Sequence, residues 1–125
     1  MLFRSEPDET PFEPVMASAP AVIFFTSGST GAPKGVTHTH ETIGWMLAVS
    51  AAGLELDPDD LLLAGSSLSH VGAFYVTFGA LGAGAGIVVA QTFDGDELLP
   101  LLREHRPTVL SMLPSALFEI GRAHV

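Results

Sequence analysis

Short apolar segments alternate along this chain with longer stretches of helical periodicity, and this alternation constrains the fold more than any other feature. The apolar segments predict strands over residues 21–26, 61–64, 86–90 and 108–113. None shows the polar alternation of a strand with one face in water, which favours burial on both sides. With helices between such strands, the sequence predicts an α/β fold: a layered parallel sheet with helices on both faces.

Helices are expected between these strands. They are predicted from residue 40 to about 53, from 71 to 81, from 94 to about 105, and from 114 onward. Thr39 or His40 is expected to cap the first helix, and Pro114 suits the first turn of the last. Pro100 falls inside the third helix, where a proline costs roughly 3 kcal/mol, and the sequence offers no compensation. Residues 36–38 are a further candidate strand.

A loop rich in glycine and hydroxyl side chains follows the first predicted strand. Its candidate binding residues are Thr26, Ser27, Gly28, Ser29, Thr30, Gly31, Lys34 and Gly35. Glycines let backbone N–H groups converge on an anion, hydroxyls add donors, and Lys34, the only lysine of the chain, adds a positive charge. Because ligands of parallel sheets bind beyond the carboxyl ends of the strands, this loop is predicted to bind phosphate there. The alternative is a flexible surface linker, which is rarely found between two apolar segments.

Composition excludes several classes of function. Hydrophobic residues make up 47% of the chain and charged residues 15%, which is too apolar for a disordered protein. The net charge of −9 argues against binding to nucleic acid or to an anionic membrane surface. The absence of cysteine excludes thiolate metal sites and cysteine nucleophiles. The first residues lack the pattern of a signal peptide, so a cytoplasmic protein is expected.

Residues 71–90 carry no charged side chain and are long enough to span a bilayer. Glycines at positions 82, 84 and 86 interrupt this stretch, and each would weaken a continuous helix by roughly 1 kcal/mol. We therefore predict a buried helix, a glycine turn and a buried strand, with no stable membrane span. A small membrane protein remains an alternative.

The run Phe25–Gly35 resembles the signature [YF]-T-S-G-[ST]-T-G-x-P-K-G of the adenylate-forming (AMP-binding) superfamily, and every defined position matches. This superfamily includes acyl-CoA synthetases and the adenylation domains of nonribosomal peptide synthetases. The pair Thr39-His40 and the stretch from residue 108 to 115 are also similar to family segments. Ser67–Ala73 resembles the family segment P-[LM]-[FY]-H-x-x-G, with serines in place of the proline and the aromatic residue.

The resemblance implies an ATP-dependent ligase that converts a small-molecule carboxylic acid to an acyl-adenylate and then to a thioester with coenzyme A (CoA). ATP, Mg²⁺ and CoA are the implied cofactors. The loop Thr26–Gly35 would wrap the β- and γ-phosphates, with Lys34 as counter-charge, and His70 would lie near the acyl pocket and the adenylate. Lys34 and His70 are the catalytic candidates. A non-catalytic nucleotide- or phosphate-binding module is the alternative.

Two groups of residues have simpler interpretations. His38, His40 and His70 have no cysteine partner, and lone histidines are more often packing or hydrogen-bonding residues, so a metal site is not expected. Trp45, Phe74, Tyr75 and Phe78 are spaced as core residues of helices, although Phe74 and Tyr75 would border an acyl pocket if His70 does.

The resemblance divides the chain into three parts. Residues 1–20 are expected to be a loop or tether, residues 21–118 part of an adenylation domain, and residues 119–125 a non-native tail, since residues 120–125 match one translated frame of a sequencing adapter. The later motifs of the family are absent. The segment is therefore expected to be an incomplete, inactive fragment.

Overall fold

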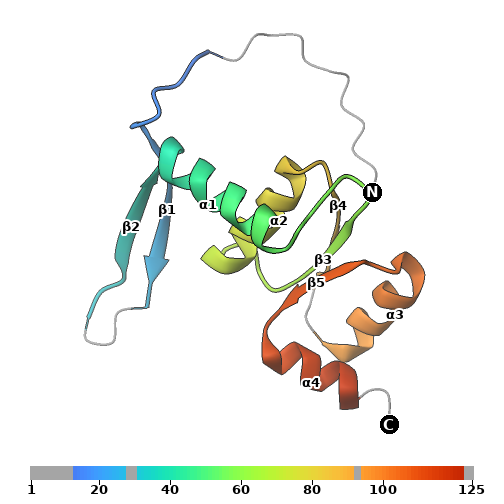
Figure 1. Ribbon diagram of the computed structural model, residues 1–125. Helices are drawn as coiled ribbons and strands as arrows, with labels where there is room; N and C mark the ends of the chain where they lie inside the picture. Colours follow the sequence, from blue (N-terminus) through green and yellow to red (C-terminus); the bar gives the residue numbers. More distant parts are fainter. Residues whose placement is uncertain (1–12, 28–30, 92–93, 123–125) are drawn as a thin grey trace.

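The computed structural model describes residues 13–27, 31–91 and 94–122 (Figure 1). Strands and helices alternate over most of this part of the chain. They are β1 (Pro20–Thr26), β2 (Lys34–Thr39), α1 (His40–Gly53), β3 (Leu61–Gly65), α2 (Val71–Gly82), β4 (Gly86–Val89), α3 (Gly95–His105), β5 (Val109–Met112) and α4 (Pro114–Arg122).

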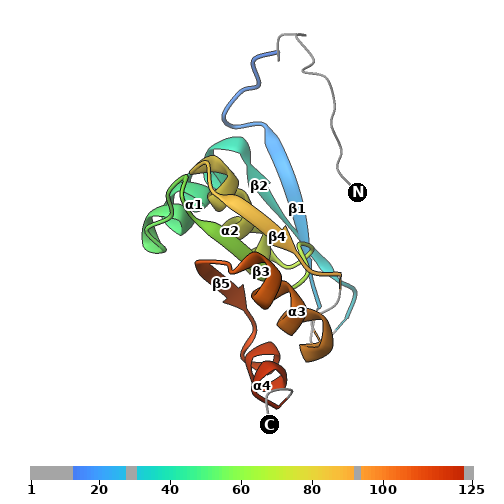
Figure 2. The ribbon, with the colours of Figure 1, turned by 90° about the vertical axis from the view of Figure 1, so that its right-hand side faces the viewer.

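A three-stranded parallel sheet forms the centre of the fold, in the order β4-β3-β5. Successive residues of β3 point to opposite faces. Leu62 packs with Ala80 and Ala85 on the side of α2, whereas Leu63 packs with Leu98 of α3 and residues of α4. Figure 2 shows α3 and α4 on the side of the sheet away from α1 and α2. The predicted α/β fold, a parallel sheet with helices on both faces, is confirmed.

The first predicted strand does not belong to that sheet. β1 pairs antiparallel with β2 in a separate two-stranded sheet, hereafter the hairpin. The intervening residues 27–33 are too few for the crossover of a dozen or more residues that parallel pairing needs. Residues 21–26 were predicted to be buried, and this is wrong: Ile23 and Phe25 are 52% and 72% exposed, while Val22 and Phe24 are half-buried.

Helix α1 follows β2 directly and packs against α2. Thr39 caps it as predicted: its side chain accepts from the Thr42 backbone N–H, and the Thr42 hydroxyl accepts from the Thr39 N–H. The two helices lie so close that a Cβ on Gly79 would be 2.8 Å from the carbonyl oxygen of Leu47. Trp45 is 68% exposed, so its assignment to the core is wrong. It lies on the face of α1 that no described element covers.

The stretch from residue 71 to 90 forms α2, a turn and β4, as the glycine pattern predicts. Gly84 has a φ of 83° in the turn, a conformation that favours glycine. No helix in the described ranges is long and apolar enough to cross a membrane.

Pro100 lies inside α3 as expected, at an exposed position of the helix. A proline has no N–H to donate to the carbonyl four residues earlier, here that of Asp96. Both Pro100 and Asp96 are exposed, so water can reach the free carbonyl.

The structure bears differently on the two predicted ends of the domain, the tether before residue 21 and the boundary after residue 118. Residues 1–12 of the expected tether lie outside the described residues, but residues 16–19 form a turn that is hydrogen-bonded to the start of α1. The backbone N–H groups of His40 and Glu41 donate to the carbonyls of Ala19 and Ala17. At the other end α4 continues across residue 119 to Arg122, so the helix does not mark the predicted boundary there. That boundary stays a prediction.

Candidate functional site

The predicted phosphate loop lies at the tip of the hairpin. Thr26 and Lys34 are opposite each other in the register, and the Thr26 hydroxyl donates to the Lys34 carbonyl at 3.4 Å. Gly28, Ser29 and Thr30 lie outside the described residues, whereas Ser27 and Gly31 flank them. The loop was expected beyond the carboxyl end of a strand of the parallel sheet. This is wrong, because β1 belongs to the hairpin.

Side chains of β1 approach Gly35 closely. A Cβ at this position would lie 3.0 Å from Ile23 Cγ2 and 3.4 Å from Phe25 Cε1, on the strand opposite. At Gly31, by contrast, an added Cβ would meet nothing within 4 Å. Space is therefore tight at Gly35 and open at Gly31.

His70 lies at the edge of the parallel sheet where α/β proteins usually bind ligands. The segment that carries it follows the carboxyl end of β3, the central strand of the parallel sheet, and His70 is the N-cap residue of α2. Its backbone N–H donates to the Ser67 carbonyl at 2.9 Å, and the hydroxyls of Ser67 and Ser69 are 2.8 Å apart. The imidazole makes no capping bond and is exposed.

A pocket of about 520 Å³ brings the hairpin and the His70 segment together. Its lining residues are Val22, Ile23, Phe24, Phe25, Leu68, Ser69, His70 and Phe74. Phe74 therefore borders the same pocket as His70, as anticipated, whereas Tyr75 and Lys34 are not among the lining residues. The walls are apolar apart from Ser69 and His70, so this pocket suits the apolar part of a ligand.

A cluster of rings joins the hairpin to α2. Phe24 and His38 from the hairpin meet Phe74 and Tyr75 from α2, edge to face, with centroids 5.3 to 6.1 Å apart. The Tyr75 hydroxyl lies 3.4 Å from His38 Nε2. Burial raises the pKa of Tyr75 above its usual value. Sequence reasoning missed this pairing, because no local pattern shows which helix a hairpin residue will meet.

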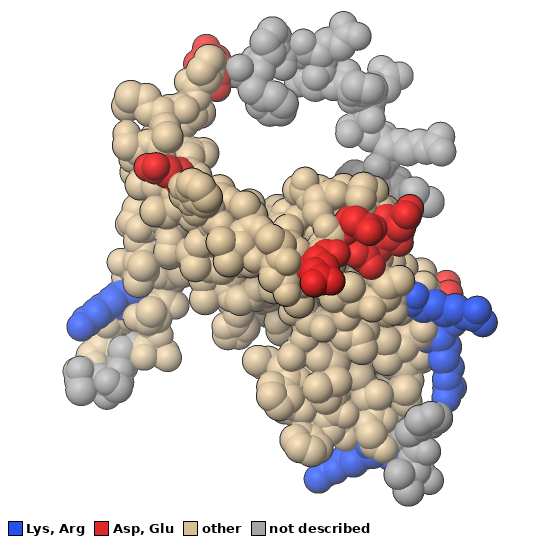
Figure 3. All heavy atoms as spheres, in the orientation of Figure 1, with Lys and Arg blue, Asp and Glu red and all other residues tan. Residues whose placement is uncertain are grey.

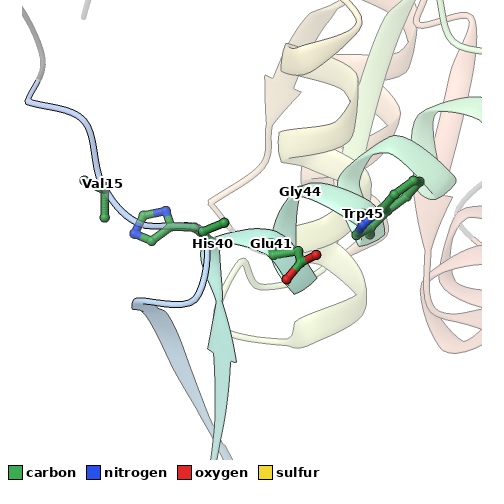
Figure 4. Close-up of a pocket in the computed structure, with 6 residues that line it drawn as sticks. Val15, His40, Glu41, Gly44 and Trp45 are labelled. Carbon is green, nitrogen blue, oxygen red and sulfur yellow. The ribbon is translucent and has the colours of Figure 1, made fainter.

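A second pocket, of about 430 Å³, lies at the start of α1 and shares no residue with the first. It is lined by Val15, Ala17, His40, Glu41, Gly44 and Trp45. Figure 4 shows the labelled side chains spread along an open surface, with His40 and Trp45 directed apart. No three histidine, aspartate or glutamate side chains converge on a metal position in the part of the chain that the structure describes.

Charge is unevenly distributed around the hairpin. Four acidic residues gather in one turn between α1 and β3: Glu55, Asp57, Asp59 and Asp60. Figure 3 shows this acidic turn well separated from the hairpin. In the described strands of the hairpin, Lys34 is the only charged side chain. Among the described residues, this acidic turn therefore lies away from the hairpin strand that carries Lys34.

Comparisons with known proteins identify the family to which the chain is similar. The model of a family described as AMP-binding enzyme matches residues 2–124. The chain is 36% identical over 118 residues to the "Probable non-canonical nonribosomal peptide synthetase (NRPS) CymA" of Salinispora arenicola (strain CNS-205), covering 93% of this chain and 2% of the relative. It is 33% identical over 125 residues to the acetyl-coenzyme A synthetase of Cupriavidus metallidurans (strain ATCC 43123 / DSM 2839 / NBRC 102507 / CH34). This match covers 93% of this chain and 18% of the relative.

Among solved structures, the AMPPNP-bound form of the nonribosomal peptide synthetase FmoA3 superposes with a TM-score of 0.78 at 30% identity. The match covers 92% of this chain and 12% of that one. The chain thus spans less than a fifth of the length of the two curated relatives described above.

Proposed function

Since the chain belongs to the AMP-binding enzyme family, we propose that residues 21–118 are part of the adenylation domain of a ligase that activates a carboxylic acid with ATP. The acid is first converted to an acyl-adenylate and then to a thioester with CoA. The observation that carries the proposal is the complete match of Phe25–Gly35 to the family signature. The described residues of this run include the end of β1, which lines an apolar pocket, and the start of β2. The acetyl-coenzyme A synthetase relative and the AMPPNP-bound structure support it.

In the first step a carboxylate oxygen attacks the α-phosphorus of ATP. A new bond forms between that oxygen and phosphorus, the bond to the bridging oxygen breaks, and pyrophosphate leaves. Negative charge grows on the departing phosphates, so donors at the hairpin tip and the Lys34 ammonium stabilise the transition state by charge neutralisation. In the second step a thiolate attacks the acyl carbon and AMP leaves.

Mg²⁺ would supply further neutralisation of the phosphate charge when bound. The described residues contain no converging set of three acidic or histidine ligands. Beside nucleotides, Mg²⁺ is usually held by one or two carboxylates together with phosphate oxygens.

The pocket beside His70 is proposed to receive the carbon chain or ring of the acid. Its walls come from β1 and from the segment before α2, and they are mostly apolar. An apolar fatty or aromatic acid therefore fits better than an amino acid. His70 lies at the polar end of this lining, where its imidazole would face the carboxylate and the adenylate.

The test is pyrophosphate release by the longer reading frame that contains this segment, measured over a panel of carboxylic acids. Lys34→Ala is expected to lower kcat/KM about ten- to a hundredfold, because a hydrogen bond to a charged partner contributes roughly 1.5–3 kcal/mol. Ser29→Ala is expected to cause a smaller loss. Arg103→Ala removes an exposed positive charge from α3 and serves as the matched control.

Release that depends on the acid and weakens in both loop variants would support the ligase. ATP binding without release for any acid would instead favour a non-catalytic nucleotide-binding module. The 125-residue segment by itself is expected to show no turnover, since it leaves large apolar side chains such as Phe25 and Phe118 72% exposed.

A further inference from the structure

The position of the hairpin depends on its contacts with helices, because the hairpin is not part of the parallel sheet. Its base is fixed by the chain itself: β2 ends at Thr39, where α1 begins, and Ala19 accepts a hydrogen bond from His40. Its tip carries the predicted phosphate loop. Between base and tip, the ring cluster is the described contact that joins the hairpin to α2.

Within this cluster, His38 and Tyr75 make the polar contact. Tyr75 is 7% exposed, and its hydroxyl makes a partly buried contact, where a hydrogen-bond partner is favoured. His38 Nε2 lies 3.4 Å from the phenol oxygen, and either atom can donate, depending on the histidine tautomer. Ring packing tolerates sliding of one element over another, whereas a hydrogen bond fixes direction as well as distance.

The two residues connect the two elements that carry the candidate catalytic residues. His38 stands on β2, four residues after Lys34, and Tyr75 stands on α2, five residues after His70. Both β2 and α2 are regular elements, so a shift at this contact is transmitted along each of them. The separation between the hairpin tip and the His70 pocket therefore depends on this contact.

We propose that His38 and Tyr75 are a pair of positioning residues for acyl-adenylate formation, an inference that rests on the ligase function proposed above. Their hydrogen bond sets the hairpin tip relative to the pocket that holds the acid. Adenylation needs the α-phosphorus and the carboxylate oxygen in contact, and small misplacements of reacting groups slow such reactions strongly. The pair acts on the alignment of bound substrates, and nucleotide affinity depends mainly on the loop itself.

The first test is steady-state adenylation kinetics of the longer reading frame. Tyr75→Phe keeps the ring and removes the hydroxyl, and His38→Leu removes the partner nitrogen. Each is expected to lower kcat about tenfold while the KM for ATP changes less than about twofold. His38→Gln offers an amide to the phenol and is expected to restore most of kcat. The double variant is expected to be no slower than either single variant, because both remove one interaction.

Phe78→Leu is the matched control. Phe78 stacks on Phe74, its ring is partly exposed, and it is not among the described rings that meet His38. The substitution perturbs the same helix and leaves the hydrogen bond in place. Unchanged kcat in Tyr75→Phe, additive losses in the double variant, or an equal loss in Phe78→Leu would overturn the proposal.

A second readout does not depend on catalysis. Hydrogen exchange of the backbone amides of β1 and β2 is expected to be roughly two- to tenfold faster in Tyr75→Phe and His38→Leu, the range that corresponds to losing one net hydrogen bond. In His38→Gln and Phe78→Leu it should stay near the unmodified rate. If no acid supports pyrophosphate release, the ligase function fails, yet the exchange data still decide whether the pair holds the hairpin. Unchanged exchange in both bond-breaking variants would refute the pair as a positioning contact.

Discussion

The hydroxyl of Thr108 donates a hydrogen bond of 2.7 Å to Oδ1 of Asp60, joining residues 48 positions apart in the sequence. The same hydroxyl accepts from the backbone N–H of Leu61 at 3.0 Å. The Thr108 N–H also donates to the Leu61 carbonyl. These bonds align the starts of β3 and β5, which bear the core of the parallel sheet. The backbone N–H of Asp57 donates to the other carboxylate oxygen of Asp60, Oδ2, at 3.0 Å. The bonds from Thr108 and, to a lesser extent, from Asp57 hold the pKa of Asp60 below its usual value of 3.8.

Replacing Thr108 by valine is expected to raise the pKa of Asp60 toward 3.8, because the strongest donor to its carboxylate is lost. A lowered pKa contributes stability above the unfolded value that is lost as pH falls through the folded one. The stability difference between the unmodified chain and Thr108→Val should therefore shrink on acidification. Carboxyl NMR titration and unfolding at several pH values measure both effects. Thr108→Ser keeps the hydroxyl and should leave the Asp60 pKa low; a high value there would contradict the assignment.

Gly65→Ala is expected to destabilise the fold by about 1–3 kcal/mol, as overpacking does in close-packed sites. A Cβ on Gly65, at the end of β3, would lie 2.6 Å from the Cβ of Met112 on β5. The strands must separate locally to admit it. Gly44→Ala is the matched control: nothing lies within 4 Å of its Cβ position in α1, so it should be neutral or stabilising. Denaturant unfolding compares the two, and equal stabilities would show that β3 and β5 can separate without cost.

Much of the fold could be predicted because its elements carry strong local signals. The apolar run of β3, the glycine turn after α2 and the Thr39 cap each match the structure. The placement of β1 could not be predicted from apolar content, because half-burial against α2 and full burial in a sheet both select apolar residues. The length of the loop from residue 27 to 33 was the signal that favoured a hairpin. The assignment of Trp45 to the core was wrong for a related reason. Helical spacing shows which residues share a face of a helix, but it does not show whether another element covers that face.

The candidate site was predictable in its chemistry and not in its geometry. The match of Phe25–Gly35 to a known signature identified the loop, and the roles of its residues remain predictions. That His70 shares a pocket with residues of β1 follows from packing between segments over 40 residues apart. For His38 the sequence favoured a packing or hydrogen-bonding role over metal binding, but it named no partner. Its contact with Tyr75 depends on the hairpin register and on the position of α2, which no local pattern encodes.

Thr77→Val is expected to stabilise the fold by about 1 kcal/mol. The Thr77 side chain is 1% exposed in α2, and its hydroxyl oxygen has no hydrogen-bond partner among the described residues. Burial of an unpaired hydroxyl costs roughly 1–3 kcal/mol, and valine keeps the shape without the polar atom. Thr77→Ser is the control, since it keeps the hydroxyl, removes a methyl group and should destabilise. Thermal or denaturant unfolding measures both, and a valine variant less stable than the serine one would show that the hydroxyl is paired.

Alkaline pH is expected to weaken the fold through Tyr75, the only tyrosine of the chain. Burial raises its pKa above the ordinary value of 10.0, so the folded state keeps the phenol proton after the unfolded state has lost it. A raised pKa gives stability that is fully present below pH 10.0 and is lost as pH rises through the folded value. Because Tyr75→Phe has no proton to lose, its stability relative to the unmodified chain should improve above pH 10.0. Ultraviolet titration of tyrosinate reports the pKa without overlap from other tyrosines of this segment. A Tyr75 pKa at the ordinary value, or parallel profiles of stability against pH for the two chains, would contradict this prediction. Either result would mean that water reaches the phenol despite its contact with His38.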